Sequence, residues 1–335
     1  MERKKIIELE LGEEIEGFFL IKEILYKTAS NSKNYLDMRL SDGTGEINAK
    51  LWECSEKEAS LYQLFQLVKV RAQVTEWQGK KQLRITRMRR AQESDGLNIE
   101  DFVPTAPLKP QKMFELVEAY IEKIANKDIK MIVQVIMEEN KEKILYYPAA
   151  KTNHHAIRSG LLYHIVRMLE LAEKLSEIYP FVNRDLLFAG VILHDIAKID
   201  EMDANPLGMV KDYTAEGQLL GHIVQGIKRV VQVGEQVGAD EEISILLQHM
   251  ILSHHYEPEF GSPKKPMIPE AELLHYIDII DARMYDMENA LMKIEPKQFT
   301  ERIWVLERKL YKAAFDSDDE AASAMDETGK EKQIR

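Results

Sequence analysis

The alternation of apolar and polar side chains changes its period once along this 335-residue chain. Up to about residue 90, short segments alternate with a period of two, which is typical of half-buried strands. Five strands are predicted, at Glu16–Leu25, Tyr35–Leu40, Glu46–Trp52, Val68–Glu76 and Gln82–Arg87. Residues 41–45 and 77–80 contain the glycines that hairpin turns require, and residues 56–66 are helix-like. Five strands with a helix between the third and fourth predict an oligonucleotide-binding (OB) barrel.

Further along, apolar residues recur at helical spacing, i, i+3 and i+4. Helices are predicted at Met113–Ala125, Ile129–Asn140, Gly160–Ile178, Arg184–Ile199, Gly221–Val233, Glu241–Ser253, Pro269–Glu288 and Thr300–Ala314. A polar connector with three prolines separates the two patterns. The predicted fold class is therefore multidomain, with an all-β barrel at residues 1–92, a connector at 93–112, an all-α bundle at 113–315 and an acidic, disordered tail at 316–335.

Composition indicates a soluble globular protein, with 45% hydrophobic and 30% charged residues. The longest apolar runs have about eight residues, whereas a membrane-spanning helix needs roughly 20. The N-terminus does not lead into an apolar signal region. Cys54 is the only cysteine, which excludes an internal disulfide and fits a reducing compartment. We therefore expect a cytoplasmic protein.

The net charge of −12 is unevenly distributed. Residues 1–95 hold 17 Lys and Arg against 16 Asp and Glu, so the acidic excess belongs to the remainder of the chain. Residues 69–90 contain eight basic residues and a single acidic one, Glu76. Basic side chains neutralise phosphates, and aromatic rings stack on unpaired bases. The nucleic-acid-binding candidates in this part are Tyr35, Trp52, Trp77, Lys80, Lys81 and Arg84. Alternatively, the aromatic residues fill the barrel core and the basic run is a solvated face.

The apolar run Leu187–Leu193 leads directly into His194 and Asp195. Burying an unpaired carboxylate costs several kcal/mol, as an order of magnitude, unless a partner or a cation compensates it. Lys198 is predicted to lie one turn beyond His194 on the same helix face. A bound metal ion would explain the pair, and a structural hydrogen-bonded pair is the alternative.

Other histidines and a carboxylate occupy similarly apolar contexts. His164 and Asp278 lie on apolar helix stripes, His222 begins a helix, and His254 and His255 follow the apolar run 250–252. Each alone fits an ordinary core residue. Together they provide imidazoles and carboxylates from separate helices, a donor set that manganese, iron or zinc accepts.

The order of these residues resembles the HD-domain superfamily of metal-dependent phosphohydrolases. With the OB barrel and the connector, the chain resembles the YhaM-type 3′-to-5′ exoribonucleases over almost its whole length. The stretches that carry the resemblance are Gly160–His164, Gly190–Asp195, Glu216–His222, Leu252–His255, Gly261–Lys264 and Ala271–Asp278. The segment after His255, Tyr256-Glu-Pro-Glu-Phe, lacks the Gly-Tyr-Pro signature of cyclic-dinucleotide HD enzymes.

The resemblance implies a site with two divalent metal ions. His164, His194, Asp195 and Asp278 would bind the first ion, and His222, His254 and His255 the second, with Asp195 bridging. The sequence leaves open which of His254 and His255 is the ligand and whether Asp281 competes with Asp278. Asp195 and Lys198 are the expected catalytic residues, and His154, His155, Arg158 and Lys264 are candidate phosphate contacts. Manganese is the expected ion, with iron, cobalt, zinc and magnesium as alternatives.

The implied function is stepwise hydrolysis of single-stranded RNA, and also of single-stranded DNA, to nucleoside monophosphates. The barrel would hold the strand and the helical domain would cleave it. Two alternatives remain at this stage: a small-nucleotide HD phosphohydrolase and a non-catalytic RNA-binding protein. Apolar positions on the terminal helices also allow a homo-oligomer.

Overall fold

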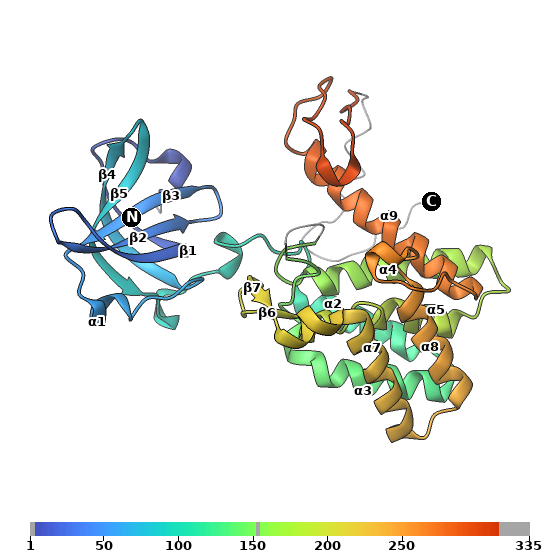
Figure 1. Ribbon diagram of the computed structural model, residues 1–335. Helices are drawn as coiled ribbons and strands as arrows, with labels where there is room; N and C mark the ends of the chain where they lie inside the picture. The colour runs from blue at the N-terminus through green and yellow to red at the C-terminus, as the bar shows by residue number, and fades with distance from the viewer. Residues whose placement is uncertain (1–3, 152–154, 315–335) are drawn as a thin grey trace. The chain divides into compact units, whose positions relative to one another are not determined.

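The computed structural model describes residues 4–151 and 155–314. The N-terminal part is a closed five-stranded barrel with the order β1-β2-β3-β5-β4 (Figure 1). The strands are β1 (Glu14–Thr28), β2 (Asn34–Ser41), β3 (Glu46–Trp52), β4 (Leu67–Trp77) and β5 (Lys80–Arg90). Neighbouring strands pair antiparallel except β3 and β5, which pair parallel. The predicted OB barrel is confirmed, although the helix after β3 is only the single turn α1 (Glu56–Ala59).

The barrel interior is filled by alternate side chains of each strand. In β4, Val68, Val70 and Val74 are fully buried. Lys69 and Arg71 lie between them in the sequence, so the two-residue period of a strand directs them outward. The alternation that predicted the strands therefore also separates an apolar core from a charged outer face.

Residues 91–109 contain two short 3-10 turns, η2 (Glu93–Asp95) and η3 (Ile99–Asp101). Helix α2 (Pro110–Glu122) then begins with proline at its first position, where the missing N–H removes no helical hydrogen bond. The predicted limits at residues 92, 112 and 315 stay predictions. The predicted tail, 316–335, lies outside the described residues.

The C-terminal part is helical, as its period predicts. The remaining helices are α3 (Lys127–Ile144), α4 (Gly160–Ile178), α5 (Arg184–Leu193), α6 (Lys198–Glu201), α7 (Ala215–Val237), α8 (Glu241–Ser253) and α9 (Pro269–Leu291). Every residue from Leu186 to Leu193 in α5 is buried, and α2, α3, α4 and α8 pack around this helix (Figure 1). A hairpin of β6 (Met202–Ala204) and β7 (Val210–Tyr213), which the sequence did not predict, joins α6 to α7.

The predicted continuous helix Arg184–Ile199 is wrong, because the chain leaves the helix after Leu193. In a continuing helix the Val191 carbonyl would accept the N–H of Asp195. Instead, the ring Nδ1 of His194 lies 2.9 Å from that carbonyl. The chain proceeds through tight turns, with Lys198 N–H donating to the Asp195 carbonyl at 3.0 Å. Lys198 therefore does not share a helix with His194.

The chain divides within α9 into two compact units, one up to Asp278 and one from Ile279. In the second unit, the predicted helix Thr300–Ala314 is wrong. Bridges join Phe299 to Tyr311 and Ile303 to Arg308 around the 3-10 turn η5 (Trp304–Leu306). Trp304 is 87% exposed, so the helical spacing of apolar residues here does not mark a buried face.

None of the helices in residues 4–151 and 155–314 combines the length and apolar content needed to cross a membrane.

Two glycines of α7 allow a matched test of the packing beside α6. A Cβ on Gly217 would lie 2.2 Å from the Glu201 carbonyl oxygen, whereas the nearest atom to a Cβ on Gly226 is a methyl group at 3.4 Å. We expect Gly217→Ala to lower the free energy of unfolding by about 1–3 kcal/mol through overpacking. Gly226→Ala should be neutral or stabilise by up to about 1 kcal/mol through helix propensity. Urea denaturation measures both; equal effects would show that α7 does not pack tightly on Glu201.

Candidate metal centre and nucleic-acid face

Helices α5 and α8 end in the same way, each on a histidine ring. The Nδ1 of His194 lies 2.9 Å from the Val191 carbonyl, and the Nδ1 of His254 lies 2.7 Å from the Ile251 carbonyl. A carbonyl can only accept, so Nδ1 carries the proton in both rings and Nε2 presents a lone pair. Both residues are 0% exposed, and their ring centroids are 5.1 Å apart. Two helix ends thus place two free ring nitrogens in one buried region.

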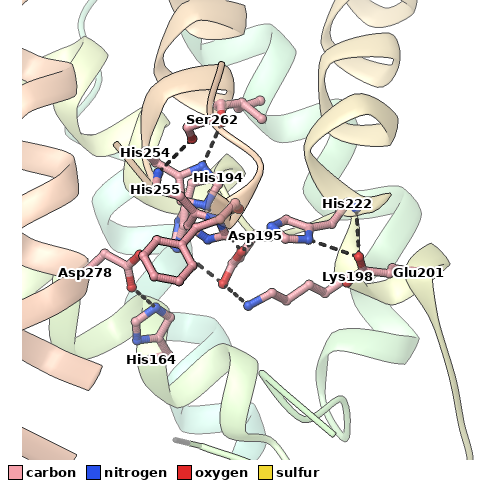
Figure 2. Close-up of polar contacts among 12 residues, drawn as sticks. His164, His194, Asp195, Lys198, Glu201, His222, His254, His255, Ser262 and Asp278 are labelled. Carbon is pink, nitrogen blue, oxygen red and sulfur yellow. Dashed lines mark hydrogen bonds and ion pairs between the residues drawn. The ribbon is translucent and has the colours of Figure 1, made fainter. Parts of the chain in front are cut away.

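Asp195 lies at the centre of the cluster (Figure 2). Its Oδ2 is 2.6 Å from the Lys198 Nζ and 3.4 Å from the His194 Nε2. Its Oδ1 is 3.4 Å from the His222 Nε2 and 3.8 Å from the His254 Nε2. The carboxylate therefore faces rings from α5, α7 and α8 together.

The charge of Asp195 is maintained despite its burial. Burial, the largest influence, would raise the pKa of this carboxyl group, but the positive charge of Lys198 holds the pKa well below its ordinary value. Conversely, burial would lower the pKa of Lys198, and Asp195 raises it. The two groups form a buried ion pair in which each preserves the charge of the other.

His222 is positioned by a break in α7. Gly221 adopts φ 69° and ψ 165°, a left-handed conformation that favours glycine. The Oε1 of Glu201 accepts the backbone N–H of His222 at 3.0 Å and lies 3.2 Å from its Nδ1 (Figure 2). Burial would raise the pKa of Glu201, but its contacts with His222 lower the pKa overall. An ionised Glu201 accepts the Nδ1 proton, so the Nε2 of His222 faces Asp195 as an acceptor.

The remaining predicted ligands are held by similar contacts. His255 donates its N–H to the Ser262 Oγ at 3.1 Å, and its Nδ1 lies 2.6 Å from the Phe260 carbonyl. Burial lowers the pKa of His254 and His255, which keeps both rings neutral. His164, from α4, places its Nε2 3.2 Å from the Asp278 Oδ1, from α9. Burial would raise the pKa of Asp278, but His164 lowers it overall.

Four buried polar atoms of this cluster have no hydrogen-bond partner within residues 4–151 and 155–314. These atoms are the Nε2 of His194, His222 and His254 and the Oδ1 of Asp195. A buried polar atom without a partner is costly, and native structures rarely keep several together. The free atoms are lone-pair donors of the type that divalent transition metals bind.

The geometry groups these donors around two positions. One group contains Asp195, His222, His254 and His255, and the other contains His164, His194 and Asp195. Within each group the candidate ligand atoms lie within 4.8 Å of one another, and Asp195 belongs to both. This His/Asp cluster could hold metal ions.

The other helical-domain candidates are in different surroundings. His155 is buried, with its ring centroid 5.2 Å from that of His164. Arg158 donates its Nε to the Pro206 carbonyl at 3.2 Å, and Lys264 is exposed. His154 lies outside the described residues. The predicted phosphate contacts of His155, Arg158 and Lys264 stay predictions.

Glu201 and Ser262 are the supporting residues that sequence analysis missed. Glu201 follows the His-Asp pair by six positions, and it contacts His222 only because the chain turns after α5. Ser262 lies in Gly261–Lys264, one of the stretches that carry the family resemblance, so its position in that motif could have identified it.

The outer face of the barrel brings two of the predicted aromatics together. Cross-strand pairing places Tyr35 opposite Trp52, and their rings stack with centroids 4.5 Å apart at 26°. Lys50, which sequence analysis did not name, lies 5.1 Å from the Tyr35 ring centroid and pairs in register with Arg84. Trp52 is 38% exposed, so the alternative that it fills the core does not hold. Two aromatic rings and two cations share one face across β2, β3 and β5.

Several residues of the basic run predicted to bind nucleic acid form ion pairs or hydrogen bonds with other residues of the N-terminal part. Ion pairs join Lys69 to Glu16, Arg71 to Glu14 and Arg89 to Asp95. The Nζ of Lys81 donates to the Leu9 carbonyl. Trp77 and Lys80 flank the turn between β4 and β5, where Trp77 is 63% exposed.

Replacing Glu201 tests the positioning of His222. Glu201→Ala should weaken binding of manganese or cobalt by about 10- to 100-fold, because outer partners fix the ring nitrogen that faces the metal. Isothermal titration of the purified protein measures the affinity. Glu216→Ala is the matched control, since this exposed glutamate of α7 forms an ion pair with Lys228. Unchanged affinity in Glu201→Ala would exclude the contact as a determinant of the site.

An HD domain model matches residues 161–283, and a model of the OB-fold nucleic acid binding domain matches residues 21–91. The 3′-5′ exoribonuclease YhaM of Geobacillus sp. (strain WCH70) is 45% identical over 94% of this chain and 96% of its own. The proteins of the same name from Bacillus subtilis (strain 168) and Bacillus velezensis are 41% and 42% identical, each over 93% of this chain and 99% of their own. The chain belongs to the YhaM family of 3′-5′ exoribonucleases, as its motifs predict.

Proposed function

We propose that this protein is a metal-dependent 3′-to-5′ exoribonuclease that releases nucleoside monophosphates from single-stranded RNA. The observation that carries the proposal is the convergence of three histidine Nε2 atoms without hydrogen-bond partners on the carboxylate of Asp195, whose Oδ1 also has no partner within the described residues. The names of the relatives support the substrate and the direction of cleavage. The OB barrel in the same chain supports a polymeric substrate instead of a free nucleotide.

His164, His194, Asp195 and Asp278 would hold one divalent ion, and Asp195, His222, His254 and His255 a second. The two donor groups that share Asp195 support this assignment for every residue except Asp278, which enters it through its contact with His164 at 3.2 Å. Mixed imidazole and carboxylate donors suit manganese, and also iron, cobalt or zinc. When bound, such ions lower the pKa of a coordinated water and neutralise charge on the phosphodiester.

The protein side chains would divide the remaining work. Asp195 supplies a permanent negative charge between the two donor groups, because Lys198 keeps it ionised. Lys198 would place a positive charge beside the phosphate on which negative charge develops, as electrostatic catalysis requires. Hydrogen bonds at Nδ1 orient the rings of His194, His254 and His222, so that their Nε2 atoms face Asp195. The partners are the backbone carbonyls of Val191 and Ile251 and the carboxylate of Glu201.

The barrel would grip the strand through the face formed by Tyr35, Trp52, Lys50 and Arg84. Stacking on aromatic rings tolerates any base, and the two cations would neutralise phosphates. The same contacts can accept single-stranded DNA, because they do not require a 2′-hydroxyl.

Degradation of a 5′-labelled single-stranded RNA by the purified protein tests the reaction. With manganese, we expect a ladder that shortens from the 3′ end. Asp195→Asn should reduce the rate by more than about a thousandfold, because it removes the charge shared by both donor groups. A chelator should abolish the ladder. Hydrolysis of free nucleotides without RNA degradation would instead favour a small-nucleotide phosphohydrolase, and no hydrolysis of either with metal bound would favour a non-catalytic RNA-binding protein.

The role of the barrel face is tested by Trp52→Ala. Loss of one stacked base is worth about 1–3 kcal/mol, so KM for a long RNA should rise several-fold or more while kcat changes little. Trp304→Ala, in the second unit, removes another exposed tryptophan and serves as the control. A fall in kcat with unchanged KM would contradict a gripping role for Trp52.

A further inference from the structure

The segment after His255 is closed on itself and tied to the metal centre. The Glu257 carbonyl accepts the N–H groups of Phe260 at 3.0 Å and Ser262 at 3.3 Å. The Oγ of Ser262 accepts the backbone N–H of His255 at 3.1 Å, and the Phe260 carbonyl oxygen lies 2.6 Å from the ring Nδ1 of His255. We call residues 257–262 the 257–262 turn. Its position is therefore set by a candidate metal ligand.

A second contact fixes this turn from the other side. Gly261 has φ +98°, and a Cβ built on it would lie 3.2 Å from the Cδ1 of Ile223. Ile223 directly follows His222 in α7, so the turn lies between two candidate ligands of one donor group. The ring centroids of His222 and His255 are 5.4 Å apart.

The two aromatic residues of this region are used differently. Tyr256 packs against His275, with centroids 4.8 Å apart, and the Nζ of Lys265 lies 4.8 Å from its ring centroid. Phe260 is 70% exposed, although its own carbonyl is bonded to the His255 ring. The backbone of Phe260 is thus rigidly held at the metal centre while its ring remains open to solvent.

We propose that Phe260 is a stacking platform for a nucleobase that flanks the scissile phosphate. The inference rests on the proposed function, since it needs a strand whose phosphate lies at the histidine cluster. An aromatic face one hydrogen bond away from a ligand histidine is within reach of a base on that phosphate, and base stacking is sequence-tolerant. Exposed Lys264, two residues after the turn, adds a positive charge for a neighbouring phosphate.

Stacking distinguishes this role from a purely structural one, because it requires a base. The experiment uses two 5′-labelled RNAs, one ordinary and one in which the last two 3′ nucleotides are abasic. Phe260→Ala should lower kcat/KM for the ordinary RNA by roughly 5- to 150-fold, the range for one lost stacked base. It should leave the abasic-ended RNA unchanged, and Phe260→Trp should restore activity on the ordinary RNA.

Phe181→Ala provides the matched control. Phe181 is 73% exposed and precedes α5, whose opposite end carries His194. This variant should cleave both RNAs like the wild type. Manganese affinity of Phe260→Ala should also stay at the wild-type value, because the carbonyl that contacts His255 belongs to the backbone.

Three results would overturn the proposal. If Phe260→Ala lowered kcat/KM equally for both RNAs, Phe260 would have a structural role. If kcat/KM stayed unchanged for both, Phe260 would not contact the substrate. If manganese affinity fell, the substitution would act through His255. If the wild type itself fails to shorten either RNA, the proposed function fails instead, which separates the two conclusions.

Discussion

The buried charge of Asp195 is the constraint on which the rest of the site depends. A carboxylate at 3% exposure is tolerated only with nearby positive charge or strong donors. Lys198 meets this need from one side at 2.6 Å. The other side is lined by imidazole nitrogens whose lone pairs cannot donate to it. Lys198 thus balances the charge at one oxygen of Asp195, and a cation held by the cluster could balance the charge at the other.

Backbone geometry, more than side-chain packing, aims the histidines. In α5 and α8 a carbonyl of the last helical turn accepts a hydrogen bond from the ring of the histidine that follows the helix. The orientation of each ring is therefore set by the helix backbone. In α7 the corresponding role belongs to the break at Gly221 and to Glu201. The close approach of Gly217 to the Glu201 carbonyl keeps these two segments together. The candidate ligands are therefore carried at helix ends and at a helix break, where backbone contacts fix the orientation of their rings.

The sequence predicted most of the architecture because hydrophobic periodicity reflects which face of each element is buried. It predicted α4 and α8 to the residue, and it predicted the OB barrel from alternation and turn residues. It failed where a side chain competes with the backbone, as when His194 takes the Val191 carbonyl and ends α5. It also failed at Thr300–Ala314, where Trp304, Val305 and Tyr311 are exposed and no α-helix forms.

The candidate site was only partly predictable for a related reason. The candidate ligands could be noticed because polar residues are unusual within apolar helical segments. The order of their motifs then indicated the family and its ligand set. Glu201 does not stand out in that way, and its role depends on a turn that no periodicity describes. Likewise, the density of basic residues in β4 and β5 could not reveal that Lys69, Arg71 and Arg89 form ion pairs with Glu16, Glu14 and Asp95.

The carbonyl-anchored rings have a consequence for how such a cluster would take up an ion. In small zinc domains the ligands assemble only when metal binds, so the ion is part of the folding reaction. Here contacts with the Val191 and Ile251 carbonyls and with Glu201 set the ring orientations. Folding and metal loading would therefore be separate steps, and an ion held by the cluster would exchange while the helices stay folded.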